Sequence, residues 1–348
     1  MSKPVTYQEI MTQDVAWQQA IELIDQNRLD LEHLNLEQFD QVIFTGCGST
    51  YYLALAAASL FQELTQIPAR GLPASELLFY PLSVFPKKLR TLLVAISRSG
   101  ESTETVTAVE QFVRNQLGEV LIITNYEQKP FAKMGKINFA IPAGKEQSIA
   151  QTRAFSSMYV CIVGMAALLA GRKDLFAAMQ QLPLAGQVLI QKYEALAKSI
   201  GSDLSIDRFY FLGSGPRYGL ACEVSLKMKE MSLSHSEPFH FFEFRHGPKS
   251  MVTNTTLLGA FLSTSNRSME EDVIKEMRAL GARPITFASD NADVVFPTLF
   301  PEEIINVLYL PIMQLIAYYR ALAKGLDPDR PTNLDAVVRL NGLNGRSG

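Results

Sequence analysis

One stretch of the sequence occurs twice: QVIFTGCGSTY at residues 41–51 and RFYFLGSGPRY at residues 208–218. In both copies a run of apolar and β-branched residues ends in Gly-X-Gly and leads into a helical pattern. The second copy follows the first closely, with Gly213 standing 167 residues after Gly46 (213 − 46). A buried strand, a glycine turn and a helix together make the basic unit of a parallel α/β sheet. The stretch therefore predicts an α/β fold.

Three further pairs of segments repeat in the same order downstream. The first two pairs are strand-like apolar runs, and the third pair consists of long apolar helical segments. They are 91–97 with 256–263, 120–124 with 283–287, and 154–169 with 303–323. We therefore expect a duplicated chain with two tandem flavodoxin-like, doubly wound parallel-sheet subdomains, each with three layers in the order α/β/α.

The strand–helix alternation also predicts element positions and domain boundaries. In the first half, strands are expected near 41–45, 92–96, 120–124 and 138–141, and helices near 50–64, 102–116 and 152–170. The expected divisions are an N-terminal helical segment at 1–34, a first subdomain with the binding loops at 35–185, a second subdomain at 186–325 and a C-terminal tail at 326–348. Prolines and late glycines predict that the tail is extended from Asp327 onwards.

The composition excludes several classes of function. The 348 residues are 47% hydrophobic and 19% charged, and the net charge of −3 provides no basic field for nucleic acid or an anionic membrane. The cysteines at 47, 161 and 222 are too few and too widely spaced for a disulfide framework or a CxxC metal site. The N-terminus has no apolar signal core, and the run from Tyr159 to Ala170 is too short to span a bilayer. We expect a cytoplasmic protein.

The first candidate binding loop is GCGST at residues 46–50. Its glycines allow a ligand to approach the backbone, and the N–H groups at the start of the following helix favour an anion. An ordinary strand-to-helix turn would also explain the glycines, and a dinucleotide site is a rival. However, Tyr51 stands where GxGxxG needs its third glycine, and in the second copy Gly219 comes one residue too late.

The second candidate loop is SRSGEST at residues 97–103, which again joins a strand to a helix. It carries four hydroxyl groups in seven residues. Hydroxyl and N–H groups at a helix start suit the oxygens of a phosphate, although an N-cap with spare serines is the simpler alternative. A P-loop is excluded because no GKS or GKT follows. Two such loops predict a phosphate monoester on a small molecule.

Charged residues that could carry out chemistry occur in the second half. Glu223, Lys227 and Glu230 are spaced i, i+4 and i+7 and therefore share one helix face. A solvated salt-bridge stripe is one interpretation, but the helix is otherwise largely apolar, and a buried carboxylate beside a lysine is a candidate general base. His246 lies in a His-Gly-Pro turn and is either a structural residue or an acid group.

Neither a metal nor an organic cofactor is expected. His235 and His240 are five residues apart, with no cysteine or carboxylate at the usual ligand spacing. A base, an acid and a phosphate anchor are sufficient to move a proton beside a sugar carbonyl, because the binding energy of the anchor holds the reacting end in place.

Six motifs, in this order, resemble the sugar isomerase (SIS) domain family and, within it, the isomerase part of glucosamine-6-phosphate synthases. They are GCGSTY at 46–51, SRSGES at 97–102, AQTRAF at 150–155, EVSLKMKE at 223–230, FRHGP at 244–248 and PTNL at 331–334. The resemblance extends from about residue 7 to residue 338.

This resemblance implies a role for each matching residue. Glu230 matches the base that moves a proton between C2 and C1, Lys227 matches a lysine that supports the open-chain sugar, and His246 matches a ring-opening histidine lent by the partner subunit of a homodimer. The positions that hold the sugar and its phosphate match Cys47, Gly48, Ser49, Thr50, Ser97, Arg98, Ser99, Ser102, Ile149 and Gln151.

The chain departs from the synthases in three respects. It begins Met-Ser-Lys and proceeds directly to the isomerase part, so we expect that it cannot hydrolyse glutamine by itself. The synthases have a lysine just after the Asn-Leu matched by Asn333 and Leu334, but here no lysine occurs after Lys324. Gln151 replaces a serine of the family. These differences favour stand-alone relatives that deaminate amino sugar phosphates or cleave fructosamine phosphates.

The first hypothesis from the sequence is therefore an enzyme that converts a 2-amino-2-deoxyhexose 6-phosphate to the ketose 6-phosphate and ammonia. A fructosamine-6-phosphate deglycase and a simple aldose–ketose isomerase remain open. A non-catalytic phosphosugar sensor is the alternative from another class. The sensor is disfavoured because the sequence has no helix-turn-helix segment or basic patch and retains both Glu230 and His246.

Overall fold

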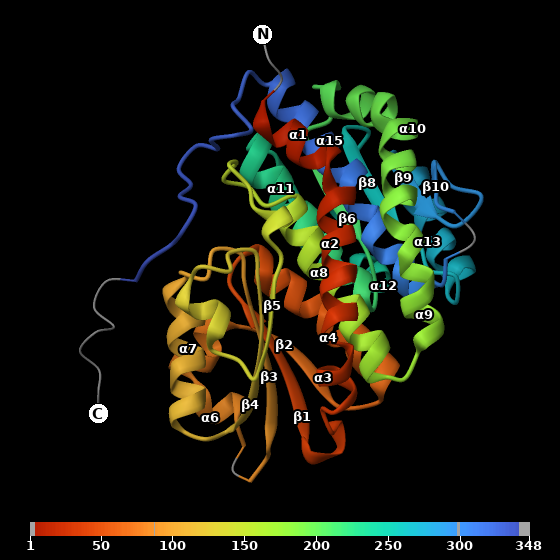
Figure 1. The fold of residues 1–348 in the computed structure, drawn as a ribbon. Helices are drawn as coiled ribbons and strands as arrows, with labels where there is room; N and C mark the ends of the chain where they lie inside the picture. The colour runs from red at the N-terminus through yellow and green to blue at the C-terminus, as the bar shows by residue number, and fades with distance from the viewer. Residues whose placement is uncertain (1–3, 87, 298–299, 341–348) are drawn as a thin grey trace.

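The computed structural model describes residues 4–86, 88–297 and 300–340 and contains two five-stranded sheets (Figure 1). All strands of the first sheet are parallel, in the order β2-β1-β3-β4-β5. They are β1 (Gln41–Gly46), β2 (Ala69–Pro73), β3 (Thr91–Ser97), β4 (Gly118–Thr124) and β5 (Ile137–Ala140). The central strands form because their apolar residues are buried on both faces.

The second sheet repeats this arrangement. Its strands are β6 (Arg208–Leu212), β7 (His235–Phe239), β8 (Thr256–Phe261), β9 (Arg283–Ala288) and β10 (Val294–Val295). They are again parallel, in the order β10-β9-β8-β6-β7, which is the order of the first sheet read from its other end. The expected fold class, with two parallel sheets covered by helices on both faces, is confirmed.

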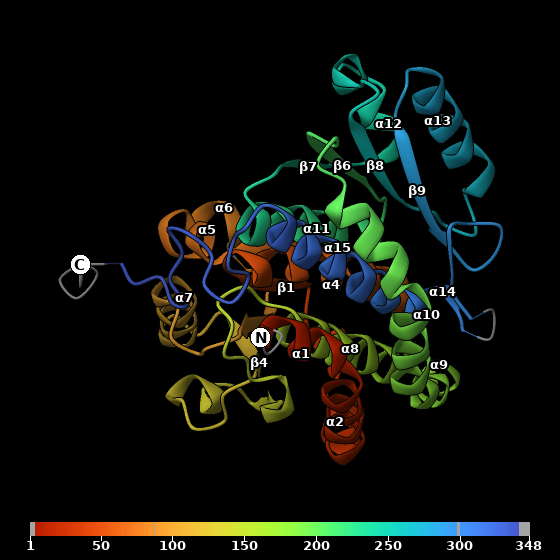
Figure 2. The same cartoon turned by 90° about the horizontal axis from the view of Figure 1, so that it is seen from above.

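Helices lie between the two sheets and on their outer faces (Figures 1 and 2). The inner helices are α2 (Gln13–Gln26), α4 (Ser49–Thr65), α8 (Arg153–Leu169), α10 (Leu182–Ser202), α11 (Pro216–Ser232) and α15 (Tyr309–Ala323). The outer helices are α5 (Ala74–Phe79), α6 (Pro81–Val84) and α7 (Thr103–Arg114) on the first sheet, and α12 (Phe241–Phe244) and α13 (Arg267–Ala279) on the second.

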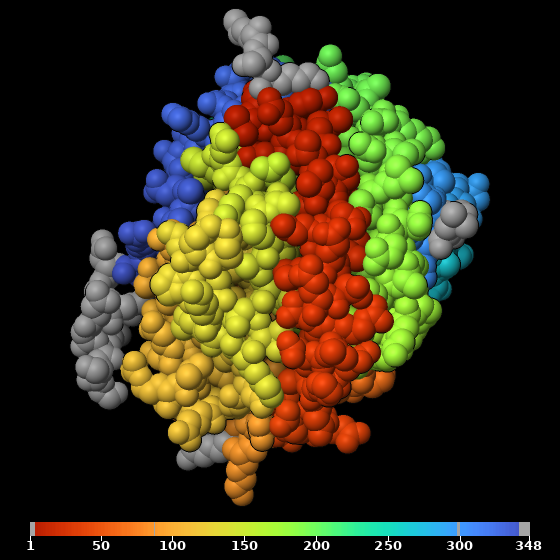
Figure 3. All heavy atoms as spheres, viewed as in Figure 1, coloured from red at the N-terminus to blue at the C-terminus, as the bar shows by residue number. Residues whose placement is uncertain are grey.

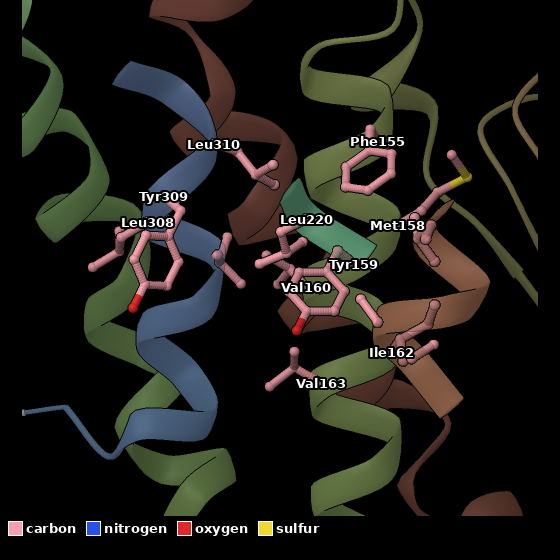
Figure 4. Packing of buried hydrophobic residues seen from close by; sticks show 14 of the residues in the cluster. Phe155, Met158, Tyr159, Val160, Ile162, Val163, Leu220, Leu308, Tyr309 and Leu310 are labelled. Atoms are coloured by element: carbon pink, nitrogen blue, oxygen red, sulfur yellow. The ribbon is translucent and has the colours of Figure 1, made fainter. Parts of the chain in front are cut away.

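The inner layer is one continuous hydrophobic core. It joins one face of each sheet, represented by Phe44 and Phe211, to the helices between them. Figure 4 shows Tyr159 of α8, Leu220 of α11 and Tyr309 of α15 in this layer, and all three are buried. Each outer face has a smaller core of its own. The halves therefore share their largest apolar cluster.

Helices α4 and α11 pack very closely at the centre of this layer. A Cβ atom added to Gly219 of α11 would lie 2.4 Å from the backbone nitrogen of Ala56 and 2.6 Å from the carbonyl oxygen of Tyr52, both on α4. Only glycine fits at this position. Because α4 and α11 each follow a Gly-X-Gly turn, their contact fixes the distance between the loops of the two halves.

The remaining elements connect and cover these layers. The N-terminal residues, red in Figure 3, lie on one face between the first half and α10. In this region Trp17 of α2 is fully buried and donates a hydrogen bond to Ser156 Oγ at 2.8 Å. The other helices are α1 (Val5–Met11), α3 (Arg28–Glu32), α9 (Lys173–Ala178) and α14 (Glu302–Ile305), and the 3₁₀ turns are 36–38, 130–133, 142–144, 179–181, 248–251 and 306–308.

Among the described residues, one segment is long and apolar enough to cross a membrane, from Glu302 to Ala323. Its apolar window is wholly buried inside the protein, as expected for a core helix. The sequence predicted one helix over 303–323, but the structure breaks it into α14, a 3₁₀ turn and α15.

The sequence prediction for the first half omitted β2, which is a half-exposed edge strand with the sequence ARGLP. Edge strands tolerate glycine and proline because one side of their backbone needs no partner. From Asp327 to Leu340 the chain has no helix or strand, in agreement with the predicted extended tail. The predicted domain boundaries stay predictions.

Candidate active site

The first loop joins β1 to α4 at the carboxyl edge of the first sheet. Gly48 has φ 56° and ψ −125°, a conformation that side chains disfavour, so the glycine is required for the turn. The hydroxyl of Thr50 accepts a hydrogen bond from the N–H of Cys47 and donates one to its carbonyl oxygen, both at 2.9 Å. Thr50 therefore stabilises the conformation of the loop.

The second loop joins β3 to α7 beside the first. The N–H of Gly100 donates to Ser97 Oγ at 3.1 Å, and the N–H of Glu101 donates to Ser99 Oγ at 3.2 Å. Ser102 is the N-cap residue of α7 but accepts no capping hydrogen bond. Because these serine oxygens serve as acceptors within the loop, the O–H groups of Ser97 and Ser99 remain available to donate to a ligand.

A cleft of about 280 Å³ opens between these two loops, α11 and the C-terminal tail. It gathers residues that are far apart in the sequence. Eight of the residues predicted for the site line it: Cys47, Gly48, Ser49, Arg98, Ser102, Ile149, Gln151 and Glu230. Ser97 and Thr50 belong to the same two loops and are buried, but they are not among the residues that line the cleft.

A buried ion-pair network connects the cleft to the second half. The Nζ of Lys227 donates to Ser49 Oγ at 3.2 Å and to the carboxylate of Glu230, and it lies 3.3 Å from Glu223 Oε1. Lys227 and Glu223 are essentially inaccessible to solvent, whereas 19% of the Glu230 side chain is exposed. The predicted shared face of α11 is therefore present, and Glu230 is its member that reaches the cleft.

Burial dominates the electrostatics of this network. It raises the pKa of Glu223 to about 8, an effect that Lys227 opposes and the nearby Glu230 reinforces. For Lys227, burial alone would lower the pKa, but the carboxylates of Glu223 and Glu230 outweigh it and raise the pKa above its ordinary value. A single lysine thus neutralises one of two carboxylates.

This imbalance predicts a dependence of stability on pH. Glu223 holds its proton up to about pH 8 in the native protein but ionises near 4.5 in the unfolded chain, so unfolding releases a proton between these values. The free energy of unfolding should therefore fall as pH rises from 5 to 8, by up to about 1.4 kcal/mol per pH unit. Glu223→Gln should remove most of this slope in urea titrations at pH 5, 6, 7 and 8.

The matched control is Glu237→Gln, which changes an exposed carboxylate of the same half. It should leave the slope unchanged. Equal slopes for Glu223→Gln and the wild type would contradict the assignment.

Arg98 holds the walls of the cleft together. Its guanidinium donates to the carbonyl oxygens of Ile149 at 2.8 Å and Ala336 at 3.0 Å and lies 3.6 Å from the buried carboxylate of Glu146. Arg98 therefore binds the backbone of the segment before α8 and of the C-terminal tail. Its position in the serine-rich loop does not indicate this role.

Two parts of the site were not recognised from the sequence. The tail lines the cleft with Leu334, Asp335, Ala336 and Val338 and is fixed to α7 by a hydrogen bond from the N–H of Leu340 to Thr103 Oγ1 at 3.2 Å. Glu104, in the first turn of α7, also lines the cleft and has a buried carboxylate oxygen without a hydrogen-bond partner. Its place two residues after Ser102 at a helix start was the available signal.

His246 is not among the residues that line the cleft. It is exposed in the turn that follows α12, on the outer side of the second sheet, where its N–H donates to the carbonyl oxygen of Glu243 at 3.0 Å. Its assignment to the site, by way of a partner subunit, stays a prediction.

A protein-family model described as "SIS domain" matches residues 35–169, which include both loops of the cleft. The chain therefore contains a SIS domain at residues 35–169.

Among curated relatives, this chain is similar to glutamine–fructose-6-phosphate aminotransferases (isomerizing). It is 27% identical to that of Caldanaerobacter subterraneus over 344 residues, covering 91% of this chain and 55% of the relative. It is 30% identical to the aminotransferase of Symbiobacterium thermophilum over 339 residues, a match that covers 91% of this chain and 54% of the relative. The chain thus spans about half the length of the curated relatives it matches.

Among solved structures, the fold is similar to that of glucosamine-6-phosphate deaminase from Thermotoga maritima, with a TM-score of 0.75 and 26% sequence identity. The match covers 92% of this chain and 100% of the deaminase chain. Tagatose-6-phosphate ketose/aldose isomerase from Escherichia coli has a TM-score of 0.83 and 24% identity, with coverage of 93% and 94%. The second likeness shows the fold alone.

Proposed function

We propose that the protein is an enzyme that converts a 2-amino-2-deoxyhexose 6-phosphate to the ketose 6-phosphate and releases ammonia. The observation that carries this proposal is the contact of Lys227 with both Ser49 and Glu230. This contact joins a loop suited to an anion to a carboxylate that faces the same cleft. An anchor and a base within one small-molecule cleft are the two requirements for proton transfer on a bound sugar phosphate.

The loops provide the anchor in this proposal. A phosphate at the start of α4 and α7 would accept hydrogen bonds from backbone N–H groups, and the helix dipoles favour its charge. The O–H groups of Ser97, Ser99 and Ser102 would donate to its remaining oxygens. The binding energy of this group then holds C1 and C2 of the sugar against Glu230.

The proposed reaction requires only proton transfer and water. In the open-chain substrate, Glu230 removes the proton from C2, the electron pair forms the C1–C2 double bond, and O1 takes a proton from water, so that the aldehyde becomes an enol. Glu230 returns the proton to C1 and the nitrogen loses a proton to water, which leaves an imine at C2. Water adds to this imine and ammonia departs, giving the ketose. Lys227 keeps Glu230 at the cleft and adds positive charge to the wall where the enol forms.

The acceptor groups of the cleft favour an amino substituent on the sugar. Glu104 and Gln151 line it, and each has a buried side-chain oxygen without a hydrogen-bond partner. Such oxygens are costly unless a ligand supplies donors. An ammonium group on C2 is a strong hydrogen-bond donor, so we propose that Glu104 and Gln151 bind the amino substituent of the sugar.

We further propose that the protein acts as a homodimer in the cytoplasm, with His246 of the partner subunit assisting ring opening. Two observations support this assignment: His246 is exposed, and the cleft of one chain contains no histidine among its lining residues. The names of the relatives, which include a glucosamine-6-phosphate deaminase, agree with an amino sugar phosphate as substrate.

The test is to incubate the purified protein with glucosamine 6-phosphate, galactosamine 6-phosphate and glucose 6-phosphate. We expect ammonia and a ketose 6-phosphate from at least one amino sugar. Ketose formation from glucose 6-phosphate without ammonia from the others would instead favour a simple isomerase. Amine release only from fructosamine 6-phosphate conjugates would favour a deglycase, and binding without any turnover would favour a sensor.

A further inference from the structure

The second half has a cavity of its own at the carboxyl edge of its sheet, where the Gly-X-Gly turn leads into α11. This cavity has a volume of about 310 Å³. Gly215 has φ 59° and ψ −136°, close to the values of 56° and −125° for Gly48 in the first loop. The backbone of the two turns is therefore nearly the same. The residues that line the cavity are Leu60, Glu63, Ser214, Gly215, Pro216, Arg217, Ser265, Asn266, Glu302, Glu303 and Asn306.

The loop after β8 also has the hydrogen bonding of its counterpart in the first half. The N–H of Asn266 donates to Ser263 Oγ at 3.0 Å, just as the N–H of Gly100 donates to Ser97 Oγ at 3.1 Å. In both halves, the helix that covers the outer face begins directly after this turn. The second half thus retains the two loops that form the proposed phosphate anchor in the first.

In the second half a carboxylate of the chain itself lies between these loops. Glu302 Oε2 accepts a hydrogen bond from the N–H of Thr264 at 3.1 Å, and Glu302 Oε1 pairs with the guanidinium of Arg217. Thr264 belongs to the loop after β8, and Arg217 belongs to the first turn of α11. One anionic group therefore bridges both loops, as a bound anion would.

The surroundings are built to hold a polar ligand. Arg217 is only 6% exposed and Asn306 only 1% exposed, and both line the cavity. The Nε of Arg217 is buried without a hydrogen-bond partner. Unpartnered polar atoms at this depth are unusual in a cavity wall that has only a structural role.

We infer that the second half contains an anion site whose resident ligand is the carboxylate of Glu302, and that a free small carboxylate can take its place when this side chain is removed. The ligand class follows from charge. Glu63 and Glu303 also line the cavity, so it holds one positive group, Arg217, among three carboxylates. A singly charged ion has the same charge as the Glu302 carboxylate that it replaces, whereas a doubly charged phosphate would be repelled more strongly by Glu63 and Glu303.

One consequence is that, of the two loop pairs in the described residues, the pair in the first half is the one left open to a sugar phosphate. The inference does not depend on the proposed reaction, because it concerns the other half and an anion without a sugar.

The test is chemical rescue of Glu302→Ala with sodium formate, with sodium chloride at equal concentration as the reference. We expect the variant to unfold at a lower urea concentration than the wild type. Saturating formate should then lower its unfolding equilibrium constant about tenfold or more relative to chloride. The wild type and Glu303→Ala, which removes a neighbouring carboxylate of the same cavity, should show no such formate effect.

Two further measurements complete the test. Where Glu302→Ala does not fold in chloride, we expect formate to restore its folded signal, and Glu302→Gln is examined in the same way. A crystal of the variant grown in formate should show the ion between Thr264 and Arg217. Equal stability in formate and chloride, or failure of both variants to fold at any formate concentration, would overturn the inference.

Discussion

Replacing Glu230 by glutamine is expected to slow exchange of the C2 proton of the sugar phosphate with solvent by about 10²–10⁴-fold. The amide has nearly the same size as the carboxylate but cannot accept the proton. Because the two loops are unchanged, the sugar phosphate should still raise the thermal stability of the variant as it does that of the wild type. The measurement is deuterium incorporation from D₂O, followed by NMR, together with a thermal-shift titration.

The matched control is Glu237→Gln, which removes an exposed carboxylate of β7 in the same half. Its exchange rate should equal that of the wild type. An exchange rate for Glu230→Gln within a factor of two or three of the wild type would refute its role as the base.

The Glu230 variant also provides a test of the proposed homodimer. If His246 acts across the interface, Glu230→Gln and His246→Asn each disable both sites of a homodimer. Mixed dimers contain one site with both defects and one intact site. Refolding the two inactive variants together should therefore restore on the order of a quarter of the activity, because half of the dimers are mixed. No recovery in a mixture that forms dimers would show that His246 does not act in this way.

Lys227→Met is expected to lower the free energy of unfolding by about 3–5 kcal/mol, the cost of leaving a buried charge without its partner. Glu230 loses its cation in this variant, and the buried Glu223, which holds its proton at pH 7, loses the ammonium group beside it. The hydrogen bond to Ser49 is lost as well, so turnover should decrease together with stability. Urea unfolding at pH 7 measures the first effect.

Two variants separate this explanation from a simple packing defect. Lys229→Met changes an exposed lysine on the same helix and should cost little stability. Adding Glu230→Gln to Lys227→Met removes the carboxylate that is left without its cation and should restore part of the loss. Equal losses in Lys227→Met and Lys229→Met, or no recovery in the double variant, would contradict the ion-pair account.

The fold was largely predictable because its signals are local. A run of apolar and β-branched residues that ends in Gly-X-Gly predicts a strand and a turn without reference to distant residues, and the same pattern occurs a second time at 208–218. The central strands were therefore located within about two residues of their observed ends. Edge strands carry a weaker signal: β7 has the sequence HSEPF, with a proline and three polar residues, and only part of it is buried.

The candidate site was predictable only in part. The i, i+4, i+7 spacing placed Glu223, Lys227 and Glu230 on one helix face, and helix geometry guarantees this result. The contact of Lys227 with Ser49 joins residues 178 positions apart, and no local pattern indicates it. Arg98 is a similar case, because its partner Ala336 lies 238 positions away. Long-range contacts of this kind depend on how the layers pack.

The pairing of Glu302 with Arg217 was also outside the reach of sequence reasoning. The repeat indicates that the second half has the same loops as the first, but it does not indicate what lies between them. The structure shows an acidic side chain from α14 between them, 85 positions from Arg217. A glutamate before an apolar helix is common, and its partner is visible only once the sheets are assembled.

The shared core between the two sheets has a practical consequence for anyone who wishes to dissect this chain. A fragment trimmed to residues 35–169 would retain both glycine- and serine-bearing turns, but it would expose the apolar side of α4 that α11 covers and that of α8 that α2 covers in the intact protein. Such a piece would aggregate rather than behave as a module. Because the core is shared, we expect the chain to unfold as one cooperative unit and truncation to remove its folding and its chemistry together.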